Sequence, residues 1–334
     1  MAFPKKCIAI DIGNHQIKIA ELERTRNQAK VIHFAMVPTP KNCLNDGLIV
    51  NKEEISNIIK SALKTSRMKS KEVIFTLASS KIITREVEFP NLKPSKLSTI
   101  IKMNASEYFP VNLDDYILDH YIIDTVEDEG EKLLKVNIIA ALSELIEDYV
   151  SLARLCDLKP AGIDYSGISL ASFAVKDGLG DGVNILLDVG SNSTMVSIID
   201  NNVMKFNRNL LYGSSLLIDS IKNHFEVDEE EALRISLERS LFDNENIDNP
   251  YLSNDMTGAI NQILTGIGRL IDYYSSRNQG KLERIYLVGG GANIHGLAEY
   301  IEKYFSMPTV ITKDFSKVVT KSKVGFEDVQ IYFA

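Results

Sequence analysis

A short pattern that occurs twice constrains the fold of this chain more than any other feature. The segment Ile8–Gly13 reads Ile-Ala-Ile-Asp-Ile-Gly, and Ile185–Gly190 reads Ile-Leu-Leu-Asp-Val-Gly. Three polar residues follow each copy, and an apolar-rich strand pattern comes next. A buried strand, a tight turn and a second strand form a hairpin, and glycine permits the backbone angles of such a turn. The repeat predicts two lobes that begin in the same way.

The residues of both turns have the chemistry of a phosphate-binding loop. Backbone N–H groups and small polar side chains in such turns bind phosphate oxygens, and an aspartate at a strand end holds Mg²⁺ through its waters. A single Asp-x-Gly is more often a plain hairpin turn, but two copies at equivalent points favour a clamp around a polyphosphate. The candidate residues are Asp11, Gly13, Asn14, Asp188, Gly190, Ser191 and Ser193, with Asp11 and Asp188 facing the metal.

A third glycine-rich turn follows the strand predicted at 284–288. Gly289, Gly290 and Gly291 allow a ligand to approach the backbone closely, and the helix predicted at 293–305 directs its N-terminus toward that turn. No Lys-Ser/Thr pair follows, so the turn is not a Walker A loop, and its spacing does not fit a dinucleotide fingerprint.

The stretch between the two repeats predicts a β-α-β-β-α-β order. Strands are expected at 82–89, 115–123, 133–141 and 160–164, with helices at 94–109 and 143–155. We interpret 85–164 as a compact subdomain inserted into the first lobe. After the second repeat, helices are expected at 214–225, 228–240 and 256–277, and a polar loop at 241–255.

Composition excludes several classes of function. The 334 residues suit two lobes, 45% are hydrophobic and 25% are charged, and the net charge is -8. No Lys/Arg cluster suggests a nucleic-acid surface. No apolar run reaches the ~18 residues that span a bilayer, and no signal peptide is apparent. The three cysteines form no motif. We therefore expect a cytoplasmic protein without direct membrane insertion.

The order of these motifs resembles the actin, sugar-kinase and heat-shock chaperone superfamily. Within it the chain is similar to the PilM family of type IV pilus assembly proteins, which are relatives of the cell-division protein FtsA. The resemblance rests on the two Asp-x-Gly loops and the Gly-Gly-Gly turn, on Lys18 and Glu21-Leu22, and on the segments Arg85–Pro90, Glu107–Pro110 and Gly296-Leu297. It covers nearly the whole chain and implies an α/β, actin-like, two-lobed nucleotide-binding fold with an inserted 1C-type subdomain.

The resemblance divides the chain into segments and adds site residues. The expected segments are 1–84 (lobe 1A), 85–164 (inserted 1C), 165–182 (return to 1A), 183–211 (lobe 2A), 212–255 (a small 2B-type subdomain) and 256–334 (the rest of 2A and the C-terminal segment). ATP and Mg²⁺ are the implied cofactors. The additional nucleotide-binding candidates are Lys18, Gly213, Glu231, Arg234, Gly290 and Gly291. Lys18 can also point to solvent, and Glu231 with Arg234 can be a solvated helix pair.

Members of this family bind the cytoplasmic N-terminal tail of the membrane protein PilN along a groove that involves 1A and 1C. The resemblance therefore implies a PilN-like tail as partner, with Tyr108, Phe109, Pro110 and Val111 as groove residues, although these can equally be core and turn residues. Pilus platform proteins and motor ATPases are expected as indirect partners, and self-association as a possibility. The chain would then lie at the inner face of the cell membrane through its partner.

Hydrolysis is less clearly implied than binding. Asp164 is the candidate catalytic residue, but Ser166 and Gly167 stand where relatives often carry a glutamate, which favours at most a weak ATPase. The chain ends at Val329–Ala334 without the final helix of the family, so this helix is absent or the sequence is truncated. An FtsA-like filament protein is the alternative, against which the missing basic amphipathic helix counts. A sugar-kinase enzyme would need substrate insertions that the sequence lacks.

Overall fold

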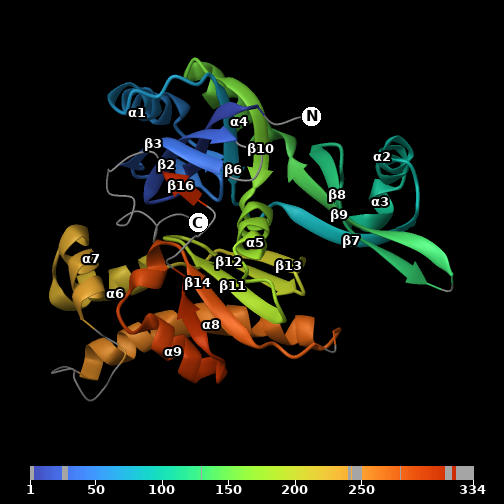
Figure 1. Ribbon diagram of the computed structural model, residues 1–334. Helices are drawn as coiled ribbons and strands as arrows, with labels where there is room; N and C mark the ends of the chain where they lie inside the picture. The colour runs from blue at the N-terminus through green and yellow to red at the C-terminus, as the bar shows by residue number, and fades with distance from the viewer. Residues whose placement is uncertain are drawn as a thin grey trace.

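The computed structural model describes residues 4–24, 29–128, 130–239, 242, 250–278, 280–312 and 318–320. Two lobes lie one above the other, and a smaller subdomain projects to one side of them (Figure 1). Each lobe is built on its own sheet, and the subdomain has a third sheet.

The first lobe contains a six-stranded sheet in the order β10-β6-β1-β2-β3-β16. Its strands are β1 (Lys6–Ile12), β2 (Gln16–Arg24), β3 (Ala29–Pro38), β6 (Glu72–Leu77), β10 (Lys159–Tyr165) and β16 (Val318–Thr320). The helices of this lobe are α1 (Lys52–Thr65) and α4 (Ser143–Leu155), and a small hairpin joins β4 (Leu44–Asn45) to β5 (Leu48–Ile49). Asn51 caps α1, whose Ile55 and Ile59 lie one turn apart and fully buried.

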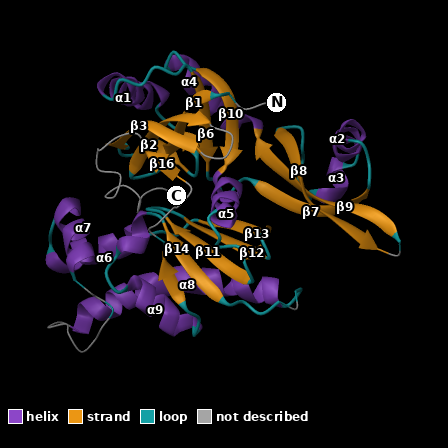
Figure 2. Cartoon of the chain, viewed as in Figure 1, coloured by secondary structure: helices purple, strands orange, loops and turns teal. Residues whose placement is uncertain are grey.

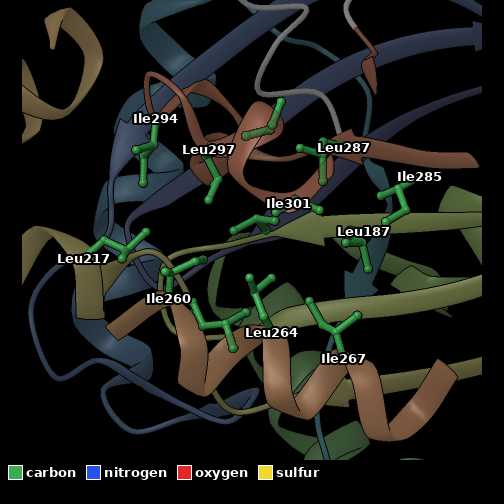
Figure 3. Close-up of a cluster of buried hydrophobic side chains, with 14 of the residues drawn as sticks. Leu187, Leu217, Ile260, Leu264, Ile267, Ile285, Leu287, Ile294, Leu297 and Ile301 are labelled. Carbon is green, nitrogen blue, oxygen red and sulfur yellow. The ribbon is translucent and has the colours of Figure 1, made fainter. Parts of the chain in front are cut away.

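The second lobe contains a five-stranded sheet in the order β13-β12-β11-β14-β15. Its strands are β11 (Val183–Val189), β12 (Thr194–Asp200), β13 (Val203–Leu210), β14 (Arg284–Val288) and β15 (Thr309–Ile311). Its helices are α6 (Ser215–Phe225), α7 (Glu229–Glu238), α8 (Pro250–Ser275) and α9 (Leu297–Phe305), and a 3₁₀ turn spans Gly290–Asn293. Figure 3 shows Ile260, Leu264 and Ile267 of α8 packed beneath Leu187 and Leu287 of the sheet.

Strand pairing confirms the internal repeat. The strand β1 pairs antiparallel with β2 and parallel with β6, and β11 pairs in the same two ways with β12 and β14. Asp11 and Asp188 therefore occupy equivalent places near the end of the first strand of each hairpin. The mixed α/β, two-lobed arrangement agrees with the predicted actin-like fold.

The inserted subdomain is smaller than the predicted 85–164. It consists of β7 (Ile83–Pro90), α2 (Pro94–Met103), α3 (Ala105–Tyr108), β8 (Tyr116–Asp128) and β9 (Glu131–Leu142), with a sheet in the order β7-β9-β8. The expected order of elements is present, but α4 and β10 lie in the first lobe, because Leu145 and Tyr149 of α4 belong to its core and β10 pairs with β6. A single helix over 94–109 was also wrong, since it breaks at Asn104.

Residues 165–182 do not simply return to the first lobe. The helix α5 (Ser166–Lys176) buries Leu170, Ala171 and Ala174 against the second sheet. The residues it meets, Leu186, Ile199 and Val288, alternate with those that face α8, so α5 and α8 cover opposite faces of that sheet. The predicted division followed the family resemblance, whereas the apolar face of α5 decides where this helix packs.

Two further differences concern the second half of the chain. The prediction placed a loop at 241–255, but 250–255 form the first turns of α8; residues 240–241 and 243–249 lie outside the described residues. The prediction also assigned 256–334 to the second lobe, whereas β16 pairs parallel with β3 in the sheet of the first lobe. The predicted features of the last residues, 321–334, fall outside the described residues.

Glu21 holds the centre of the first lobe together through buried hydrogen bonds. Its Oε1 accepts from the N–H of Lys69 at 3.0 Å and from the N–H and hydroxyl of Ser70, both at 2.7 Å, and its Oε2 lies 2.7 Å from Nδ1 of His33. Burial alone would raise the pKa of Glu21, but the hydrogen bonds from Ser70, His33 and the backbone of Lys69 lower this pKa to about 2.

We expect Glu21→Gln to lower the free energy of unfolding by about 3 kcal/mol at pH 7, because the pKa falls from an ordinary 4.5 to about 2 on folding. A lowered pKa stabilises the fold above pH 4.5, and this stabilisation is lost as the pH falls toward 2. Urea unfolding measured across this range should show the loss in the parent chain and not in the variant. Glu23→Gln, two residues along the same strand and more exposed, is the matched control; an equal effect of both changes would contradict the prediction.

Candidate functional site

The first Asp-x-Gly loop is anchored to the end of β3. The N–H of Gly13 donates to the carbonyl of Gln16 at 3.0 Å and closes the turn. The hydroxyl of Thr39 donates to the Gly13 carbonyl at 2.6 Å, and the Thr39 N–H donates to the carbonyl of His15 at 3.0 Å. The side chain of Asn14 donates to the Leu44 carbonyl at 3.5 Å, so that its amide is directed toward the β4–β5 hairpin.

The second loop repeats this turn and is joined to the start of α6. The N–H of Gly190 donates to the Ser193 carbonyl at 2.9 Å. The N–H and hydroxyl of Ser214 donate to the Gly190 carbonyl at 2.9 and 3.1 Å, and the Ser215 N–H donates to the Ser191 carbonyl at 2.8 Å. The N-terminus of α6, which carries a partial positive charge, therefore lies directly beside the loop.

Glycines allow close packing between the second Asp-x-Gly loop, the start of α6 and the late glycine turn. A Cβ on Gly213 would lie 2.3 Å from the Ser191 carbonyl oxygen, and one on Gly291 would lie 2.8 Å from that of Val189. Gly289 has φ +84°, and its Cβ would lie 2.2 Å from Oδ1 of Asp188. The late glycine turn thus lies against the strand end that carries Asp188, which brings together three sequence motifs that are far apart along the chain.

Two carboxylates and one ammonium group lie between the lobes. The hydroxyl of Thr76 donates to Oδ1 of Asp11 at 2.9 Å, and Nζ of Lys18 lies 3.6 Å from Oδ2 of the same residue. Burial raises the pKa of Asp188 to about 6; the Lys18 charge opposes this rise and the Asp11 charge adds to it. Lys18 therefore interacts with both aspartates, and the alternative in which it only meets solvent does not hold.

This donor set fits a divalent cation bound through water. Asp188 is half-buried beside the charge of Asp11, and a nearby positive charge stabilises a carboxylate in that position. No group of three or more His, Cys, Asp and Glu side chains suited to a metal occurs in the part of the chain that the structure describes, so a cation held by Asp11 and Asp188 would keep most of its waters.

A contact that the sequence did not reveal crosses between the lobes. Oε2 of Glu229, the first residue of α7, accepts from Nζ of Lys41 at 2.9 Å, and its Oε1 lies 4.0 Å from Nδ1 of His15 in the first loop. The hydrogen bond from Lys41 holds the pKa of Glu229 below its usual range. All three side chains are substantially exposed, and 188 residues separate Glu229 from Lys41 in sequence, so pattern reading had no signal for this pairing.

A buried polar network joins the lobes on the side of α5. The hydroxyl of Tyr165 donates to Oδ1 of Asn207, whose amide donates to Ser197 Oγ at 2.6 Å. Gly167 packs so tightly that its Cβ would lie 2.3 Å from the Asn207 amide nitrogen. Arg208 donates to the Thr84 hydroxyl at 3.1 Å. The sequence offered only the glycine as a hint of this close approach.

Three predicted site residues lie apart from the loops or are engaged elsewhere. Arg234 pairs with Glu231 at 2.5 Å and with Glu238 at 2.8 Å on the exposed side of α7, which matches the solvated-pair alternative. Asp164 is in register with Thr76, the residue that bonds Asp11, but its own Oδ2 accepts from the hydroxyl of Ser169 at 2.5 Å.

The predicted partner segment divides between core and surface. Phe109 is 2% exposed and belongs to the core of the inserted subdomain, so it cannot line a groove without leaving that core. Tyr108 is partly buried, with its ring edge-on to Phe89 at 5.9 Å between centroids. Pro110 is exposed, and Val111 is partly buried against the same core.

We expect Gly213→Ala to lower the free energy of unfolding by about 1–3 kcal/mol, because backbone atoms of Gly190 and Ser191 must move to admit the methyl group. Gly258→Ala is the matched control. This exposed glycine of α8 has open space around its Cβ position, and alanine there should stabilise the helix by about 0.5–1 kcal/mol. Chemical denaturation of both variants tests the contrast, and equal midpoints would contradict the proposed contact between the loops.

Comparisons with known proteins agree with this architecture. Residues 9–332 match the family model described as type IV pilus assembly protein PilM. The structure of a PilM-PilN type IV pilus biogenesis complex superposes with a TM-score of 0.82 at 18% identity, over 99% of this chain and 96% of the other.

More distant structures share the fold. MreB5 of Spiroplasma citri bound to ADP gives a TM-score of 0.54 at 13% identity, over 93% of this chain and 92% of the other. The ethanolamine utilization protein EutJ from Carboxydothermus hydrogenoformans gives 0.54 at 15% identity, over 93% and 85%. Within the described ranges no helix has the length and apolar character needed to cross a membrane. The chain belongs to the type IV pilus assembly protein PilM family, and its fold is the two-lobed actin-like fold.

Proposed function

We propose that this protein is an ATP-binding scaffold of type IV pilus assembly, which binds the cytoplasmic N-terminal tail of a PilN-like membrane protein. The observation that carries the proposal is the convergence of both Asp-x-Gly loops, the start of α6 and the late glycine turn around Asp11 and Asp188. Family membership supports the place in pilus assembly. Through its partner the protein would lie at the inner face of the membrane, with platform proteins and motor ATPases as indirect partners.

The loops have the features that a nucleoside triphosphate with Mg²⁺ requires. The backbone and small polar side chains of the two glycine turns suit the phosphates, and the N-terminus of α6 adds a partial positive charge beside them. We propose that Gly290 and Gly291 border the adenosine beside the second loop, and Lys18 supplies a positive charge next to Asp11. A bound Mg²⁺ would be held by Asp11 and Asp188 through its waters and would neutralise phosphate charge. The MreB5 structures of similar fold hold ADP and AMPPNP.

Binding is better supported than turnover. Oδ2 of Asp164 accepts a hydrogen bond from Ser169, which leaves mainly its other oxygen to orient an attacking water. Ser166 and Gly167, at the start of α5, offer no carboxylate in its place. We therefore propose that any hydrolysis is slow and that the nucleotide acts by holding the lobes in one arrangement.

We expect Asp188→Asn to weaken Mg-ATP binding by about tenfold or more in calorimetry, because it removes a charge that faces the cation. The difference in ATP affinity between the parent chain and the variant should shrink when EDTA removes Mg²⁺. The substitution also removes a charge that burial disfavours, so the ligand-free variant should be at least as stable as the parent.

Asp157→Asn is the control, since Asp157 is 77% exposed and lies away from the loops. If the parent chain itself gives no heat with Mg-ATP, the nucleotide part of the proposal is wrong. If Asp188→Asn and Asp157→Asn bind equally well, the carboxylate has no role at the cation.

We expect Tyr108→Ala to weaken binding of a synthetic peptide, made as the N-terminal tail of the PilN-like protein, by about tenfold. Of the two aromatic residues in this segment, Tyr108 is partly exposed, whereas Phe109 is fully buried. Tyr304→Ala, an exposed tyrosine of α9 in the second lobe, is the matched control. Fluorescence anisotropy measures both; unchanged affinity in Tyr108→Ala and Pro110→Ala would remove this segment from the groove.

A further inference from the structure

The outer edge of β8 carries backbone groups that no other strand uses. The sheet of the inserted subdomain has the order β7-β9-β8, so β8 pairs with β9 alone among the described strands. Figure 2 shows this sheet projecting from the body of the molecule. Ile117 and Ile122 of β8 are 45% and 46% exposed. An open edge with exposed apolar side chains is a template for an additional strand.

A groove runs between this edge and α2. One hollow of about 490 Å³ is lined on the helix side by Lys102 and Met103 and on the strand side by Tyr116, Ile117 and Leu118. A second hollow of about 160 Å³ shares Lys102 and Leu118 with the first and continues to His120. The larger hollow is of a size that holds side chains of a ligand, and residues of α2 line it opposite β8.

Two aspartates of β8 accept hydrogen bonds from backbone N–H groups of the same strand. The N–H of His120 donates to Oδ1 of Asp119 at 2.8 Å, and the N–H of Thr125 donates to Oδ1 of Asp124 at 2.7 Å. Both N–H groups therefore donate to side chains of their own strand. In a longer sheet they would instead donate to backbone carbonyls of a neighbouring strand. In a regular strand, residues that face the same way are an even number apart. The bulge in β8 between Ile122 and Asp124 adds one residue, so the two aspartates can face the same way although they are five residues apart.

The edge is also strongly acidic. Asp114, Asp119 and Asp124 are exposed, and none of them forms an ion pair with the residues that the structure describes. Lys102 of α2 lines both hollows on the opposite wall. Carboxylates without ion pairs, beside a hollow that contains the apolar side chains of Met103, Ile117 and Leu118, are complementary to a chain in which basic and apolar side chains alternate.

We propose that the groove between β8 and α2 binds an extended basic segment of another protein, which adds to the sheet as a fourth strand. Its carbonyls replace Asp119 and Asp124 on the backbone N–H groups, its apolar side chains enter the hollow beside Met103 and Leu118, and the released aspartates pair with its Lys or Arg side chains. The site adjoins the segment at Tyr108, because Ala105 and Ser106 of the same helix α3 line the larger hollow, but Tyr108 itself packs on Phe89 of β7 and the added strand lies on the outer edge of β8.

The probe is a short fluorescent peptide in which lysine alternates with valine and isoleucine, titrated into the full chain and followed by anisotropy. Two control peptides have the same length: one carries glutamate in place of lysine, and the other carries methyl groups on alternate backbone nitrogens. We expect the lysine peptide to bind, the glutamate peptide not to bind, and methylation of the amides that face β8 to weaken binding by about tenfold or more.

Variants of the chain test the same contacts. Asp119→Lys together with Asp124→Lys should weaken binding by about tenfold, whereas Glu147→Lys, an exposed change on α4 of the first lobe, should leave it unchanged. His120→Pro should also weaken binding while the fold persists, because it removes an N–H that β9 does not use.

Three results would overturn the proposal. The parent chain fails to bind the lysine peptide, or it binds methylated and unmethylated peptides equally well, which would show charge attraction without strand pairing. The third result combines two observations: the double variant Asp119→Asn, Asp124→Asn dimerises without peptide, and the parent chain binds no peptide. It would show that the aspartates only protect the edge against a second copy of this chain.

Discussion

The contact between backbone and backbone at Gly213, Gly289 and Gly291 is the constraint on which the rest of the second lobe depends. At each position a methyl group would meet a main-chain or aspartate oxygen at less than ordinary contact distance. Because nothing larger fits, the end of β11, the start of α6 and the turn after β14 are held in one arrangement. The carboxylate of Asp188 therefore has little freedom, and its position relative to Asp11 follows from how the lobes meet.

In the first lobe, side-chain and backbone hydrogen bonds hold the phosphate-loop candidate in place. Its loop is held by the hydroxyl and N–H of Thr39, and its sheet is joined to the loop after α1 by the three hydrogen bonds that Lys69 and Ser70 donate to the Glu21 carboxylate. The two halves of the repeat thus share strand order and register, but one half is fixed by side-chain hydrogen bonds and the other by glycine packing. Repeated topology does not require repeated chemistry.

The repeat, the three loops and the lobed architecture could be predicted because each rests on local patterns of a few residues. The limits of the inserted subdomain could not, since α4 and β10 look the same in sequence whichever core receives Leu145 and Tyr149. Phe109 shows the same limit, because an aromatic residue before a proline suits a groove and a core equally well. Contacts such as Glu229 with Lys41 join residues so far apart along the chain that no periodicity marks them.

The lobes are joined unequally on their two sides. Near α5 the junction is buried, through Tyr165, Asn207 and Ser197, whereas at α7 it consists of exposed charges on Glu229, Lys41 and His15. Charges in water attract weakly and are screened within about 8 Å at physiological ionic strength, while buried hydrogen bonds are not. A relative movement of the lobes would therefore break the exposed contacts at α7 more readily than the buried ones near α5. Rising ionic strength would weaken the junction between α7 and the first loop and leave the buried junction near α5 unchanged.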